Sequence, residues 1–135
     1  MTVATVRQAI ADACATVTGL RGAAYRPDQL NPPIAVVTPG EFDPRDVMVQ
    51  AEVTRPFTVS IYAGRTTEVA AQKLLDTYTD LSGSASVIAA IQASTSLHDG
   101  TTADFAEVTN VSALQVETIG AVDYLLVALT VEVAF

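Results

Sequence analysis

The stretch that decides the fold is residues 57–81, FTVSIYAGRTTEVAAQKLLDTYTDL. In its first part Phe57, Val59 and Ile61 alternate with polar side chains, which is the two-residue period of a strand with one buried face. In its second part apolar side chains recur at three- and four-residue steps, as on an amphipathic helix. The predicted apolar stripe of this helix comprises Ala70, Ala71, Leu74, Leu75, Tyr78 and Leu81. A one-faced strand and a one-faced helix form half of a core, and the other segments are expected to supply the rest.

The composition predicts a single folded domain over residues 1–135. Half of the 135 residues are hydrophobic, which is enough to bury a core without disulfide bonds. No apolar run reaches the ~18 residues that a membrane-spanning helix needs, and we expect no membrane association. The first seven residues do not resemble a signal peptide, and the single cysteine, Cys14, fits a reducing cytoplasm.

The charge is strongly acidic. Fifteen acidic residues oppose seven basic ones, which gives a net charge of −8. Such a surface disfavours binding of a nucleic-acid backbone through phosphate contacts, but it would let DNA pass without sticking. The alternative is that the charge only keeps an apolar-rich protein soluble.

The segments before residue 57 predict a helix followed by short strands. Apolar residues from Val3 to Val17 form one helical stripe, with Thr2 as the cap and Gly19 as the stop. Cys14 lies on this stripe and is expected to be a core residue. A short strand at 22–25, a proline-rich loop at 26–33, and strands at 34–38 and 47–54 follow. Their short connections predict an antiparallel meander.

The segments after residue 81 predict a short helix and two long strands. Ser84 or Ser86 can cap a helix that bears Val87, Ile88 and Ile91, and a polar loop at 94–102 follows. One strand is expected at 104–118, with a bulge near Asn110, and the last strand begins at Leu125. This last strand is apolar on both faces over its first half, so it needs a helix on one side and another cover, such as a second subunit, on the other.

Together these segments predict an α+β fold, in which a small mixed or antiparallel sheet of about five strands packs against two to three α-helices. The chain shows no glycine-rich phosphate loop and no nucleophile elbow. One histidine and one cysteine cannot form a zinc site, and His98 is expected to be solvated. The pairs Asp43 with Asp46 and Asp76 with Asp80 are also interpreted as solvated surface. The sequence therefore predicts no catalytic residue, no metal and no cofactor.

Three phrases of the chain resemble one protein family. They are LNPPIAVV at 30–37, TVSIYAGRTTEVAAQKLLD at 58–76 and YLLVALTVEV at 124–133. With the order of the elements, they look like the tail terminator proteins of long-tailed bacteriophages, especially those that infect high-GC Gram-positive hosts. The resemblance implies an α+β fold and a homohexameric ring that ends tail-tube growth and receives the DNA-filled head. The implied partners are the ring's own copies, the major tail tube protein and the head–tail connector.

The resemblance also implies a place and an assembly surface. The protein would lie at the tail–neck junction of the virion, and in the host cytoplasm during assembly. Six copies would carry a charge of −48, suited to a lumen through which DNA slides without specific binding. The loop from Pro39 to Val47 is a candidate contact arm. Within it we expect an assembly role for Glu41, Phe42, Asp43, Arg45 and Asp46.

Three other functions are weighed against this one. The first is another neck or head-completion protein of the phage connector. The second is a small-molecule-binding α+β domain, in which the apolar strand faces would line a pocket. The third is a hydrolase, for which no nucleophile, base and orienting group can be proposed together.

Overall fold

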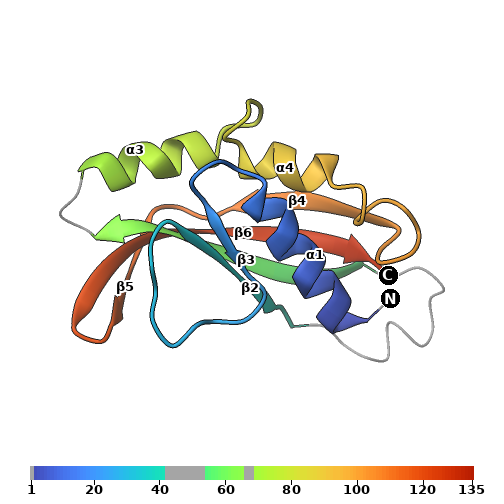
Figure 1. Cartoon of the computed structure of the whole chain (residues 1–135), viewed down its shortest axis with the longest axis horizontal. Coiled ribbons are helices and arrows are strands. Elements are labelled where there is room, and N and C mark those ends of the chain that lie inside the picture. Colours follow the sequence, from blue (N-terminus) through green and yellow to red (C-terminus); the bar gives the residue numbers. More distant parts are fainter. Residues whose placement is uncertain (1, 42–53, 66–68) are drawn as a thin grey trace.

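Two long antiparallel strands, β3 (Thr54–Arg65) and β6 (Val122–Ala134), form the centre of the structure (Figure 1). The computed structural model describes residues 2–41, 54–65 and 69–135. Within these residues, three helices pack against a mixed six-stranded sheet. The predicted α+β class is therefore confirmed. The strand predicted at 47–54 lies outside the described residues except for Thr54, which begins β3.

The sheet has the strand order β1-β2-β3-β6-β4, and β5 also pairs with β6. β2 (Ile34–Pro39), β4 (Phe105–Val111) and β5 (Gln115–Ile119) lie antiparallel to their long neighbours. β1 (Arg21–Ala23) lies parallel to β2, so the predicted meander is wrong at this edge. The loop at 24–33 explains the parallel pairing. It carries the chain back along the length of β1, so that β2 begins beside the start of β1 and runs in the same direction.

One face of the sheet carries the main core and all three helices, α1 (Val3–Ala15), α3 (Val69–Tyr78) and α4 (Val87–Ala93). The predicted alternation in β3 is confirmed, because Phe57, Val59 and Ile61 are buried on this face. They pair across the sheet with the buried odd-numbered residues Val131, Leu129 and Val127 of β6.

Helix α1 follows its prediction closely. Thr2 caps it through a capping box with Thr5, and Cys14 is fully buried. Gly19 has a positive φ of 84°, in the turn that leads from the helix into β1. Gly22 in β1 faces the backbone of Ala11, so the helix lies directly on the strand.

Helix α3 buries a narrower stripe than predicted. Ala71, Leu75 and Tyr78 are buried, but Ala70 and Leu74 are exposed and Leu81 has 81% of its surface exposed. The helix ends at Tyr78, which leaves Leu81 in the turn before α4. Ser86, and not Ser84, caps α4 by accepting a hydrogen bond from the Ala89 amide.

The strand predicted at 104–118 is two strands, β4 and β5, which both follow the same side of β6. The predicted bulge is confirmed between Val108 and Asn110. At the break, the Ser112 amide donates to the Ala128 carbonyl at 2.8 Å, and the Ser112 hydroxyl accepts from the Ala128 amide at 2.9 Å. The Ser112 hydroxyl thus takes the place of a backbone carbonyl as the acceptor for the Ala128 amide. The chain between β4 and β5 therefore stays hydrogen-bonded to β6.

The opposite face of the sheet carries a second, smaller cluster. Ile34, Val36, Tyr62 and Leu126 are buried there. The first half of β6 is therefore buried on both faces, as predicted. The cover that the sequence left open to a second subunit comes here from the chain itself. The side chains that supply it are Ala23, Leu30, Ile119 and Tyr124.

Candidate assembly surfaces

The predicted contact arm is only partly described by the structure. Glu41 is exposed just after β2, where the Gly40 amide donates to the Pro56 carbonyl at 2.8 Å. Phe42, Asp43, Arg45 and Asp46 lie outside the described residues. The assembly role of this loop therefore stays a prediction.

One edge of the sheet is open and partly apolar. β4 ends the strand order, and β5 pairs only with β6, so the outer sides of both strands are unpaired among the described residues. Four large apolar side chains on or between these strands are 39 to 60% exposed: Phe105, Val111, Leu114 and Val116. An open edge with exposed apolar side chains is a ready site for pairing with another chain. We call the stretch 105–119 the acidic edge, for the charge described next.

The charge of the protein is divided along the chain. Residues 74–135 carry eight acidic residues and no lysine or arginine. Residues 1–73 carry seven acidic and seven basic residues, so their charges cancel. Both strands of the acidic edge belong to the negative part. On this edge Glu107 lies directly opposite Glu132 of β6. Like charges directly opposite on neighbouring strands destabilise a sheet unless a cation comes near.

The other edge of the sheet is open and carries arginines. In β1, Arg21 and Gly22 are exposed, and Arg21 forms no ion pair with any described residue. Beside the strand, Tyr25 is 59% exposed and lies against the Arg7 guanidinium, which is 4.0 Å from the ring centre. Arg7 also donates to the carbonyls of Ala24, at 2.7 Å, and Val37, at 3.0 Å. We call β1 with Tyr25 and Arg7 the arginine edge.

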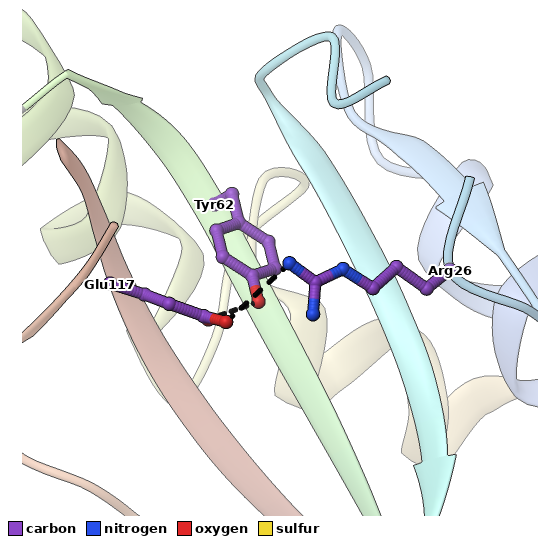
Figure 2. A network of polar contacts seen from close by, with 3 residues as sticks. All are labelled: Arg26, Tyr62 and Glu117. Atoms are coloured by element: carbon purple, nitrogen blue, oxygen red, sulfur yellow. Dashed lines mark hydrogen bonds and ion pairs between the residues drawn. The ribbon is translucent and has the colours of Figure 1, made fainter. Parts of the chain in front are cut away.

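A polar network connects three distant segments on the second face (Figure 2). The Tyr62 hydroxyl of β3 donates to Glu117 of β5 at 2.6 Å, and Arg26 of the 24–33 loop lies 3.5 Å from the other oxygen of the same carboxylate. Burial, and then the Glu117 hydrogen bond and charge, raise the pKa of Tyr62 to about 12. The sequence did not predict this network, because its members lie far apart in the chain.

Two of the grooves between described residues are open to solvent. The groove between α3 and the acidic edge holds about 240 Å³, and Leu75, Val111 and Leu114 lie along it. The groove between α1 and α4 holds about 380 Å³ and is bordered mainly by small side chains.

The residues considered for chemistry are found apart from one another. Burial raises the pKa of the Cys14 thiol to about 12, so it is a poor nucleophile. His98 is exposed, with its Nδ1 2.8 Å from the Ser94 carbonyl. Among the described residues, no three His, Cys, Asp or Glu side chains gather where they could hold a metal ion.

None of the helices in the described ranges is long and apolar enough to cross a membrane. No model of a known protein family matches the sequence, and no curated protein matches it.

Proposed function

We propose that this chain is a structural ring protein of a phage neck, and specifically a tail terminator. Six copies close the end of the tail tube, stop its growth and present the surface onto which the filled head docks. The partners are the neighbouring copies, the tube protein and the connector. Genome DNA passes through the ring without specific binding.

The acidic edge is the observation that carries this proposal. A single copy exposes unpaired strand edges with Phe105, Leu114 and Val116 beside them. Left uncovered, such an edge favours uncontrolled pairing, so it calls for a defined partner. A closed ring of identical copies covers the edge of every copy at once.

The charge distribution supports the second part of the proposal. A ring of six copies carries −48, and all of the net charge of each copy comes from residues 74–135. Carboxylates that face the lumen would repel phosphates and keep the DNA from binding. Replacing several of these acids with lysine should slow DNA delivery. Unchanged delivery would count against an acidic lumen.

The competing function as a small-molecule-binding domain finds less support. Such sites are usually concave, with a few polar groups that converge on the ligand. The groove between α1 and α4 is open and is bordered mainly by alanine, serine and threonine side chains.

The test is to locate the chain in the phage particles that contain it. Electron cryomicroscopy should show six copies between the last ring of the tube and the neck. Deleting its gene should give tails of irregular length and unjoined heads. Particles that assemble normally without the chain at this junction would refute the proposal.

The contact arm has its own test. The variant Phe42→Ala with Arg45→Glu should give abnormal tail length or poor head joining. Normal tails and normal joining would remove Glu41, Phe42, Asp43, Arg45 and Asp46 from the assembly surface and leave the ring itself untouched.

A further inference from the structure

We infer that the copies join head to tail through opposite edges of the sheet, with the acidic edge of one copy against the arginine edge of the next. This inference rests on the proposed ring and names the two surfaces that build it. It depends on three features of the described residues: open strand edges, opposite charges and matching faces.

The first feature is that both edges are free to accept a strand. β1 at one end of the strand order, and β4 with β5 at the other, have unpaired outer sides within the described part of the chain. Counted along the sheet, β1 and β4 run in opposite directions. If the sheet continues into the next copy without inversion, β4 therefore meets the next β1 in an antiparallel pair, the more stable arrangement.

The second feature is charge complementarity. Glu107 and Glu132 face each other on the acidic edge without a described cation, and Arg21 is exposed on the other edge without a described carboxylate. An arginine brought beside the two carboxylates relieves their repulsion. The chain already uses this kind of pair internally, because Arg26 reaches Glu117 of β5.

The third feature is that these charges share one face of the sheet. Arg21 is in register with Ile34 and Glu107 with Glu132, and both positions belong to the face that carries the second cluster. In a sheet that continues from copy to copy, side chains of the same face become neighbours. If the two charge groups lay on opposite faces, edge pairing could not bring them together.

A two-fold contact of the acidic edge with itself is the competing arrangement. It would place the carboxylates of two copies against each other, where like charges oppose association. It would also give closed pairs and not a ring. The two arrangements predict different behaviour for variants of each edge.

The test uses one variant for each edge and follows association by sedimentation. Arg21→Glu reverses the arginine edge. Glu107→Arg reverses the charge on β4, and Gln115→Arg in the same variant adds a positive charge on β5, so both strands of the acidic edge are changed. All three side chains are exposed, and circular dichroism should show unchanged folding. Each variant alone should associate roughly ten-fold more weakly than the wild type, or worse.

Mixing the two variants in equal amounts should restore association, because each supplies the intact edge that the other lacks. The control is Leu81→Arg, which adds a charge at an exposed apolar site on neither edge and should change nothing. If Arg21→Glu associates like the wild type and mixing restores nothing, the head-to-tail contact is wrong.

A wild-type protein that stays monomeric in solution is tested by cross-linking. Cys14, the only cysteine of the sequence, is buried, so only the introduced cysteines should react with a cross-linker. A short bismaleimide should link Arg21→Cys to Glu107→Cys, whose side chains share one face of the sheet, in a mixture and should link neither variant to itself. The control is the cross-linking yield between Arg21→Cys and Leu81→Cys. If the edge pair links no more than this control pair, the inference is overturned.

Particle images separate the two proposals. A neck ring whose copies touch through other surfaces would overturn the edge contact alone. A chain absent from the neck would overturn the proposed function, whatever the mixing experiment shows.

Discussion

Replacing Gly22 with alanine should force helix α1 away from the sheet. A methyl group on Gly22 would overlap the carbonyl oxygen of Ala11 and stand 2.8 Å from its carbonyl carbon. Ordinary contacts between carbon atoms are about 3.5 Å, so the carbonyl carbon alone requires a shift of at least roughly 0.7 Å. The overlapping oxygen lies nearer, so the helix must move farther than this or the strand must bend. The atoms in the way are backbone, and no rotamer change can remove them.

The cost follows from what α1 buries. Six of its residues are buried against the sheet and its neighbours, so a shift of the helix disturbs all of these contacts together. Overpacking in a well-packed core costs about 1–3 kcal/mol, and a rigid backbone obstacle places Gly22→Ala at the upper end. For a domain of this size, about 2–3 kcal/mol corresponds to a fall of roughly 7–10 °C in Tm.

Thermal and urea unfolding followed by circular dichroism measure this cost directly. The matched control is Arg21→Ala in the same strand, whose exposed side chain should change stability by less than about 0.5 kcal/mol. The double variant Ala11→Gly with Gly22→Ala should not regain stability, because the Ala11 side chain is not the obstacle. Gly22→Ala with wild-type stability would show that α1 does not lie on β1 as described.

Three further predictions concern single side chains. Ser86→Ala should cost about 1–2 kcal/mol in urea unfolding, because buried Ser86 caps α4 and donates to the Asp80 carbonyl, and the exposed Ser84→Ala is its control. Cys14 should react with a thiol reagent at neutral pH only when the protein unfolds, since burial raises its pKa to about 12; rapid labelling of the native protein would contradict this placement. Tyr62 should make stability fall as pH rises from about 10 to about 12, because the folded state keeps the phenol protonated to higher pH than the unfolded chain does. In Tyr62→Phe that fall should be smaller by the contribution of Tyr62, and equal slopes in the two proteins would refute the raised pKa.

Strong local patterns were enough to predict much of the fold. The alternation of Phe57, Val59 and Ile61 identified the core face of β3, and Ser86 was one of two predicted caps for α4. Apolar residues on both sides of β6 correctly indicated burial on both faces. In each case one periodic or capping signal acts within a few residues, where sequence and structure are closely linked.

The errors come from contacts between distant segments. Leu74 and Leu81 lie on the same helical stripe as buried Leu75, but α3 meets the sheet along a narrow strip and ends at Tyr78. The parallel pairing of β1 depends on the path of the 24–33 loop, and no short pattern encodes it.

The acidic edge was not among the predicted assembly residues for the same reason, while the predicted role of the loop at 39–47 stays a prediction. Loop residues such as Phe42 attract attention because an aromatic among charges is conspicuous. The exposure of Leu114 and Val116, by contrast, becomes visible only once β4 and β5 are known to lie outermost on the sheet. Their apolar side chains alone would have indicated a core.

The position of β6 also has a consequence for how the protein is made. β6 pairs with β3, β4 and β5, yet it leaves the ribosome after every other described strand. Until it emerges, β3 lacks one neighbour, and β4 and β5 have no strand to pair with. The nascent chain must therefore delay completion of its sheet, and we expect slow, late folding dominated by long-range pairing.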